Sequence, residues 1–407
     1  MNRSDYQVFT PARIRGLAIA NRWFRSGTAD LSLWRERRFT EEDVDLYRRL
    51  AESGIGAIVV CGPEVLTPEA FEADRLTAHS YSYEAIRVEG VAELLAAMRD
   101  ANPDVKIIAQ LECNVLVGGD RPAGPSPVSS PFYDGAFREL AADEIGVIVD
   151  AFAETALHMR AEGFDAVQLH AAHGGGLWQF LSPHANKRND RYGGAPEKRA
   201  GIIKEIVDRI RVGAEDFPVL IKANCTDYLE DGIERDGFAA LAKALETAGV
   251  DAIEVSGGTW DCLIRSEEEL GFRPVPAAES QTEILDPKRQ AYFLPYIQDL
   301  DLGIPLILVG GIRNVDRAEE VVRSGAATFV SMCRPLIREP ELVARWRDGI
   351  GQAEAECIAC NSCIYSMHLA PERLGRGLVT CLPEHDRELH AEAQRWLTTF
   401  VDSIRAP

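Results

Sequence analysis

Short apolar, β-branched runs alternate with longer amphipathic segments along most of this chain, and this alternation limits its fold more than any other feature. Eight of the runs have the length and composition of buried strands. These predicted strands are Trp23–Ser26, Ala57–Cys61, Lys106–Leu111, Ala166–His170, Val219–Ala223, Ala252–Ser256, Pro305–Gly310 and Thr328–Met332.

Helical periodicity fits the intervals between these strands. The predicted helices are Thr40–Glu52, Tyr83–Arg99, Ala142–Glu162, Pro196–Val212, Gly237–Ala248, Asp286–Leu300 and Val315–Ser324. Eight strands, each followed by a helix, predict an α/β fold of the (β/α)8 TIM-barrel type. A doubly wound open sheet is the alternative. It requires a Gly-rich dinucleotide turn after an early strand, and Ile58–Pro63 contains only one glycine.

The alternation stops near Gly351, which predicts a barrel over residues 1–350 and a C-terminal extension over 351–407. The net charge of −20 argues against nucleic acid or an anionic membrane as a partner. We find neither a membrane-length apolar run nor a basic-then-apolar leader. We therefore expect a cytoplasmic protein that acts on a small molecule, and leave open whether it forms a homo-oligomer.

Two histidines, His170 and His173, follow the fourth predicted strand and precede a long, polar, Gly-rich segment. In a barrel, the loops after the strands form the catalytic face. Two imidazoles at this spacing can direct two N–H donors at one small anion or carbonyl oxygen. We predict that both are catalytic. A purely structural role is the alternative, because isolated histidines at strand ends are more often structural.

The turns after the seventh and eighth predicted strands have the composition of a phosphate site. Gly310 and Gly311 let backbone N–H groups approach an anion closely, and Cys333–Arg334 adds a guanidinium group. Phosphate sites formed by these two loops recur among TIM barrels. A pair of packing glycines with a surface arginine is the alternative.

Two further polar residues lie in otherwise apolar strands. Gln110 closes the third strand with an amide that both donates and accepts hydrogen bonds. Lys222 lies in the fifth and needs an anionic partner, which is either a bound ligand or a core carboxylate.

The segment after His173 resembles the old yellow enzyme family, the FMN-dependent NAD(P)H:flavin oxidoreductases. The matching residues are Gln179-Phe180-Leu181-Ser182-Pro183, Asn186, Arg188, Asp190, Tyr192, Gly193 and Gly194, and later Arg334–Ile337. The resemblance implies a TIM barrel that binds FMN and uses NAD(P)H as reductant, with the phosphate at Gly310, Gly311, Cys333 and Arg334.

The same resemblance implies roles for residues around the flavin ring. Gln110 would bond the pyrimidine ring, and Lys222 would lie beside the reduced flavin. Ser26, Gly27 and Thr28 would contribute backbone or hydroxyl contacts from the turn after the first strand. Cys61 and Gly62 would be the small residues beneath the ring.

One departure concerns the proton donor. The family usually carries a tyrosine two residues after the second histidine or asparagine, and that tyrosine protonates the substrate carbon. This chain has Gly175 there. Reduction of a carbon–carbon double bond would then take its proton from water or from a group such as Asp261, Tyr81 or Tyr83. Quinones, nitro compounds and oxygen need no carbon protonation.

Four of the nine cysteines, Cys357, Cys360, Cys363 and Cys381, lie close together in the tail. Without a secretory leader, such a cluster favours a metal site over disulfides. Cys-x2-Cys-x2-Cys with a distant fourth ligand is typical of a [4Fe–4S] cluster. Zinc and metal-free thiols are the alternatives.

The run from Cys357 to Asn361 also resembles the C-I-G-C-N opening of the 2,4-dienoyl-CoA reductase and trimethylamine dehydrogenase branch. Here the third cysteine comes one residue early and the gap to Cys381 is long. We expect no FAD- or NAD-binding domain to supply electrons to the cluster as in that branch.

Together these features predict an FMN-dependent NAD(P)H oxidoreductase, with the C=C bond of an α,β-unsaturated carbonyl as the preferred acceptor. The first alternative is a quinone or nitro reductase or an NADH oxidase. The second is a flavin- and metal-binding redox sensor without efficient turnover, and the third is a dehydrogenase or amine demethylase.

Overall fold

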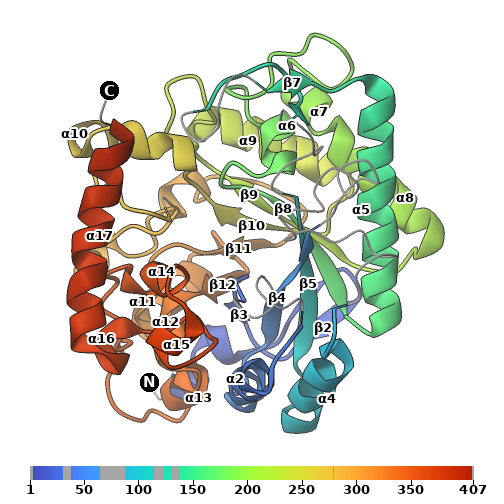
Figure 1. The fold of residues 1–407 in the computed structure, drawn as a ribbon. Coiled ribbons are helices and arrows are strands. Elements are labelled where there is room, and N and C mark those ends of the chain that lie inside the picture. The colour runs from blue at the N-terminus through green and yellow to red at the C-terminus, as the bar shows by residue number, and fades with distance from the viewer. Residues whose placement is uncertain are drawn as a thin grey trace.

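Eight parallel strands form a closed barrel in the computed structural model, which describes residues 3–30, 38–64, 88–113, 123–130, 137–277 and 279–405. The strands follow one another around the barrel in chain order, and the last pairs with the first, Val330 opposite Trp23 (Figure 1). The strands are β3 Trp23–Arg25, β4 Ala57–Glu64, β5 Lys106–Glu112, β8 Ala166–Ala171, β9 Val219–Asn224, β10 Ala252–Ser256, β11 Leu306–Leu308 and β12 Phe329–Met332. The predicted TIM barrel is confirmed, and each of the eight predicted strands overlaps one of these.

Alternate residues of each strand point into and out of the barrel, as the strand period of two requires. The interior is filled by one apolar cluster, which includes Phe24, Val59, Ile108, Leu220 and Phe329. The hairpin of β1 Ala12–Ile14 and β2 Leu17–Ile19 contributes Ile14 and Ile19 to this cluster. Intervening residues such as Trp23 pack in a second, larger cluster with the surrounding helices.

The helices surround the strands (Figure 1). They are α2 Glu41–Glu52, α4 Val91–Ala101, α5 Ala142–Glu162, α6 Gly176–Leu181, α7 Pro196–Arg199, α8 Gly201–Gly213, α9 Arg235–Thr247, α10 Glu267–Leu270, α11 Val315–Arg323, α12 Arg334–Arg338 and α13 Leu342–Arg347. Local signals set several of their ends: Thr40 and Asp43 form a capping box at α2, and Gly163 ends α5 in the left-handed conformation.

Three predicted helices differ from the structure. The α-helix predicted over Asp286–Leu300 was wrong. Only two 3₁₀ turns occur there, η4 Pro287–Arg289 and η5 Leu294–Tyr296. Proline removes a backbone donor at Pro295, and Ala291 has a φ of 55°, which no α-helix allows. Pro196–Val212 is divided between α7 and α8 at Ala200. The start of Tyr83–Arg99 lies outside the described residues, and its helix begins at Val91.

The tail from Gly351 carries short helices and one long helix, which runs along one side of the barrel (Figure 1). They are α14 Ser362–Ser366, α15 Pro371–Leu374, α16 Leu382–His385 and α17 Arg387–Arg405. They share a small apolar cluster that contains Leu374, Leu382 and Ala393. From α17, Phe400 stacks edge-on against Trp260 of η3 Trp260–Ile264, with ring centroids 6.4 Å apart. No helix in the described parts of the chain is long and apolar enough to cross a membrane.

Candidate active site

The C-terminal ends of the strands surround a cavity of about 390 Å³, which we call the inner chamber. Residues predicted from the sequence line it: Ser26, Gly27, Thr28, Cys61, Gln110, His170, His173, Lys222, Gly310, Gly311, Cys333 and Arg334. Gly62 follows Cys61 within β4. Cys357 and Cys363 of the tail also reach the chamber. Residues from separate strands therefore meet at one site, as the barrel topology requires.

A chain of hydrogen bonds joins the polar strand residues beneath the chamber. Gln110 donates to Gln168 at 2.7 Å, and Gln168 donates to Glu254 at 2.8 Å. Ser26 donates to the other Glu254 oxygen and accepts from Lys222 Nζ, each at 2.8 Å. This network fixes the side chains before any ligand binds.

Lys222 does have a core carboxylate partner, because its Nζ lies 3.9 Å from Glu254 Oε1. Neither Glu254 nor Gln168 was predicted as a site residue from the sequence. The signal for Glu254 was a fully buried acid in an apolar strand, directly opposite Lys222 in the β9–β10 register. The ammonium group of Lys222 therefore needs no ligand to balance it, yet the residue still lines the chamber.

The two histidines stand together at the end of β8, with ring centroids 5.1 Å apart. Burial, with a smaller contribution from Lys222, lowers the pKa of His170 to about 3, and burial lowers the pKa of His173 well below its ordinary value. Both rings are therefore neutral at physiological pH and each carries one N–H. His173 Nε2 lies 2.7 Å from Ser256 Oγ, whereas His170 Nδ1 is buried and has no hydrogen-bond partner among the described residues.

Because Gly175 stands where the family usually has a tyrosine, we compared the other acidic and phenolic groups that could donate a proton. Glu112, at the end of β5, lines the inner chamber, and its Oε1 lies 3.8 Å from His170 Nε2. Asp261 lies outside the inner chamber and accepts a 2.7 Å hydrogen bond from Ser130. Tyr81 and Tyr83 lie outside the described residues. Glu112 was missed because a carboxylate at a strand end has no sequence signature of its own.

The phosphate-like end of the chamber depends on Gly310 and Gly311, with φ of 106° and 76°. A Cβ at Gly310 would lie 2.6 Å from Phe293, and one at Gly311 would lie 2.9 Å from Tyr292. The segment predicted as a helix thus packs its aromatic rings against this turn instead. Glycine is required here by both backbone conformation and close packing.

Arg334 at this end is held by two other segments. Its guanidinium donates to Asn361 Oδ1 in the cysteine tail and to the backbone oxygen of Gln281. Asn361, which is 2% exposed, donates in turn to the backbone oxygens of Pro276 and Ser280. Arg313 similarly binds the backbone oxygen of Cys357. The tail therefore takes part in building the phosphate end.

Two buried polar atoms of residues that line the chamber have no hydrogen-bond partner in the part of the chain that the structure describes. The two atoms are Ser331 Oγ and His170 Nδ1. Buried polar groups are nearly always hydrogen-bonded, so these two atoms fit a site that binds a polar ligand. Together with the glycine turn and Arg334, the donors present fit a phosphate-bearing, ring-shaped cofactor such as FMN.

The four tail cysteines surround a separate cavity of about 150 Å³, which we call the cysteine cavity. Among the residues that the structure describes, no three His, Cys, Asp or Glu side chains are arranged to hold a metal ion. Burial raises the pKa of the Cys363 thiol well above its usual range and that of Cys381 to about 11. Arg334 and Arg338 line the same cavity, so positive charge faces the thiols.

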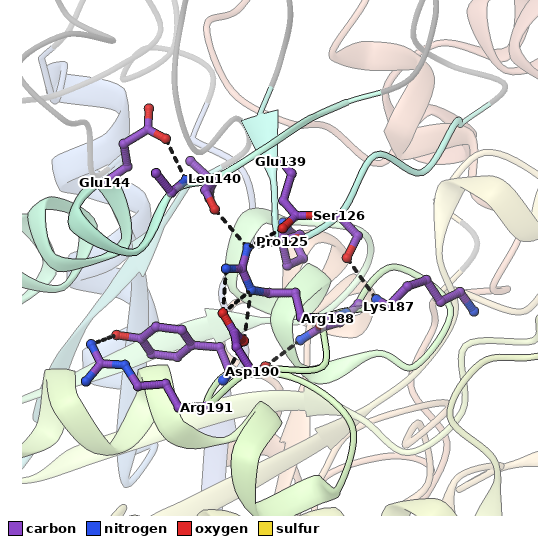
Figure 2. Close-up of polar contacts among 12 residues, drawn as sticks. Pro125, Ser126, Glu139, Leu140, Glu144, Lys187, Arg188, Asp190 and Arg191 are labelled. Carbon is purple, nitrogen blue, oxygen red and sulfur yellow. Dashed lines mark hydrogen bonds and ion pairs between the residues drawn. The ribbon is translucent and has the colours of Figure 1, made fainter.

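The loop after α6 is held by its own polar residues, as Figure 2 shows. Arg188 forms an ion pair with Asp190 and donates to the backbone oxygens of Pro125 and Leu140 at 3.0 and 2.8 Å. The Lys187 backbone N–H donates to Ser126 Oγ at 2.9 Å. The motif that carried the resemblance therefore fastens the β5–α5 connection to the loop after β8.

A family model described as the NADH:flavin oxidoreductase / NADH oxidase family matches residues 7–352. An NADH oxidase from Thermoanaerobacter brockii is 30% identical over an alignment of 367 residues, which covers 87% of this chain and 52% of that protein. A 4,4'-dithiodibutanoate disulfide reductase from Rhodococcus erythropolis is 29% identical over an alignment of 391 residues, which covers 89% of this chain and 93% of that protein. The chain spans about half the length of the NADH oxidase it matches.

Solved structures share the fold at lower identity. An old yellow enzyme homologue from Zymomonas mobilis has a TM-score of 0.65 at 22% identity, covering 86% of this chain and 94% of that one. A 2-naphthoyl-CoA reductase in complex with 2-naphthoyl-CoA has a TM-score of 0.75 at 21% identity, covering 95% of this chain and 58% of that one.

Proposed function

This chain belongs to the NADH:flavin oxidoreductase / NADH oxidase family, and on that premise we propose that it reduces the C=C bond of α,β-unsaturated carbonyls with NAD(P)H and FMN. The observation that supports this most directly is the inner chamber, where neutral His170 and His173 line the same cavity as the phosphate-like turn. The net reaction consumes one NAD(P)H and one proton for each double bond reduced.

Different residues of the chamber would bind different parts of the cofactor. Gly310, Gly311 and Arg334 would hold the FMN phosphate. Gln110 and Lys222 would bind the pyrimidine edge of the flavin ring. When bound, FMN supplies hydride transfer between NAD(P)H and the acceptor.

The neutral histidines would donate hydrogen bonds to the carbonyl oxygen of the acceptor and so orient its double bond. The buried Glu254 network keeps Lys222 and Gln110 in place during turnover. Cys61 and Gly27 leave room for a flat ring, because neither carries a bulky side chain.

The test is an anaerobic visible spectrum of the untagged protein, before and after addition of NADPH or NADH. We expect a flavin band that bleaches with pyridine nucleotide and returns when an enone is added. A colourless protein that FMN cannot reconstitute would overturn the proposal.

A quinone or nitro reductase is the second candidate, and Gly175 is the observation that favours it. Gly175 has φ of −63° and ψ of 167°, which suit any residue, and a Cβ there would make ordinary contacts of 3.4–3.8 Å. Gly175→Tyr should therefore fold and, if the chain only lacks an acid, raise enone turnover about tenfold or more. Quinone turnover in the same variant is the control. Unchanged or lost enone turnover would favour the second candidate.

We also propose that the tail cysteines hold a [4Fe–4S] cluster. Its support is that Cys357, Cys360, Cys363 and Cys381 line one cavity and that the first three have the Cys-x2-Cys-x2-Cys spacing typical of such clusters. Anaerobically purified protein should contain about four iron and four sulfide per chain. Cys363→Ser should lower both, while Cys225→Ser, a buried thiol of the barrel, should not. Zinc, or thiols without metal, would overturn this proposal.

A further inference from the structure

Glu112, at the end of β5, lines the inner chamber but takes no part in the proposed binding of FMN or of the carbonyl oxygen. It lies two residues beyond Gln110, and the strand period of two places both side chains on the same face of β5. That face points into the barrel, because Ile108 belongs to the interior cluster and the intervening Leu111 packs in the outer one. The carboxyl group of Glu112 therefore points into the barrel mouth.

The strand register sets Glu112 beside His170. β5 and β8 pair with Gln110 opposite Gln168, so Glu112 is level with His170, two residues further along both strands. The two side chains meet accordingly, with Glu112 Oε1 3.8 Å from His170 Nε2. A carbonyl compound oriented by this imidazole would therefore lie next to the carboxyl group as well.

The same edge of the His170 ring is where the tyrosine usual in the family would start. A Cβ built on Gly175 would lie 3.8 Å from His170 Cδ2, the ring carbon bonded to Nε2, and 3.6 Å from the backbone oxygen of Cys113. That oxygen also accepts a 2.6 Å hydrogen bond from the backbone N–H of Gly176. Since Cys113 directly follows Glu112, the end of β5 is fastened to the glycine run. Glu112 and position 175 thus approach the imidazole from neighbouring points.

We propose that Glu112 is the proton donor of the reaction: its carboxyl group protonates the α-carbon of the enone while His170 holds the carbonyl oxygen. This inference rests on the proposed function, because it assigns the acid for that reaction. The α-carbon of an enone is adjacent to its carbonyl carbon, so an acid beside His170 Nε2 is within reach of it. Gly175 then reflects an acid that has moved to another strand.

The step balances in atoms and charge. Hydride adds to the β-carbon of the enone, and the displaced π electrons give an enolate. The enolate takes the proton of the Glu112 O–H group, which forms the carbon–hydrogen bond at the α-carbon and leaves a carboxylate. A carboxylate beside the forming enolate would be repelled, so the carboxyl group enters the step neutral. It then regains a proton from water, to which the side chain is 20% exposed.

The test compares an acceptor that needs a proton on carbon, cyclohex-2-enone, with one that does not, menadione. Glu112→Gln removes the acid and keeps the size and hydrogen-bonding capacity of the side chain. Asp261→Asn is the comparison variant, because Asp261 is also a half-buried acid but lines a separate cavity. Turnover and KM are measured for both acceptors with FMN-loaded protein and NADPH or NADH, and the FMN content of each variant is determined.

We expect Glu112→Gln to lower enone turnover about 100-fold or more, as the loss of a general acid does, and to leave the KM for the enone and the menadione turnover within about twofold. Glu112→Asp keeps a carboxyl group and should retain at least about a tenth of the wild-type enone turnover. Asp261→Asn should change turnover with neither acceptor.

Enone turnover that survives Glu112→Gln, or an equal loss with both acceptors, would overturn the inference and leave the proposed function standing. A selective loss of enone turnover in Asp261→Asn would assign the proton to that residue and overturn it too. A wild type that reduces menadione but no enone would overturn the proposed function, and this inference with it.

Discussion

The inner chamber and the cysteine cavity lie side by side and share Arg334, yet they are assembled in different ways. The chamber takes residues from strands far apart in the sequence, and the register of a closed barrel fixes their positions. The cysteine cavity takes three of its four thiols from one seven-residue segment that runs into α14 and in which Ala359 and Asn361 have positive φ. The first site depends on the whole fold, whereas the second depends on a local turn held by two arginines.

The largest effect on turnover should come from replacing His170, which lines the inner chamber but not the cysteine cavity. His170→Ala removes the imidazole with the unpaired ring nitrogen, and turnover should fall about 100- to 1,000-fold, as for the loss of a single oxyanion donor. FMN content and iron content should not change. A loss of FMN together with activity would instead mean that His170 supports the cofactor and not the acceptor.

Arg334 tests the point where the two regions meet. Arg334→Ala should weaken FMN binding about 10- to 100-fold, because hydrogen bonds to charged groups contribute about 1.5–3 kcal/mol. The measurement is fluorescence titration of the apoprotein with FMN, with riboflavin, which lacks the phosphate, as the control ligand. Riboflavin binding should change far less, and an equal loss for both ligands would contradict a phosphate role.

The two regions should also differ in pH response. The pKa of His170 is about 3 in the folded chain, against an ordinary value of 6.5. Between these values the unfolded chain binds a proton that the folded chain does not, so stability falls as the pH falls from 6.5 towards 3. His170→Asn should remove this term, making the decline shallower by about 1.4 kcal/mol per pH unit.

Denaturant unfolding at several pH values measures this slope. Asp30, whose pKa burial raises to about 7, contributes in the opposite direction, but it is common to both proteins and cancels in the difference. His390→Asn in the tail is the comparison, because burial lowers the pKa of His390 as well. We expect a smaller change there. Parallel pH curves for wild type and His170→Asn would show that His170 is not held neutral.

The smallest effect on FMN binding should come from a residue of the tail that supports the chamber. Asn361 touches Arg334 but does not need to touch a ligand, so Asn361→Ala should weaken FMN binding only about three- to tenfold. Asn21→Ala is the matched control, since the buried Asn21 donates a side-chain hydrogen bond to the backbone oxygen of Gly54 at the other end of the barrel. Equal FMN affinity in both variants would mean that the tail does not contribute to FMN binding.

Hydrophobic periodicity and the positions of the strand ends were enough to predict the barrel and most of the residues that line the chamber. The eight strands, the residues at their C-terminal ends and the meeting of Gly310 with Arg334 all follow from one barrel rule. Glu254 and Gln168 were missed because their role depends on the strand register, and Asn361 because its bond to Arg334 joins two segments that no local pattern relates. The helix predicted over Asp286–Leu300 failed because Tyr292 and Phe293 pack against the glycine turn instead.

Barrel closure between β12 and β3 has a consequence for how the protein is made. β3, the first strand of the barrel, pairs with β4 and with β12. It cannot pair with β12 until Val330 has been synthesised, and Arg334 meets Asn361 later still. On the ribosome, the interior face of β3, with Phe24, must therefore wait while most of the chain is translated. Cofactor capture thus belongs to the last stage of maturation, and slow or interrupted translation would leave an open, aggregation-prone sheet edge in place of a flavin site.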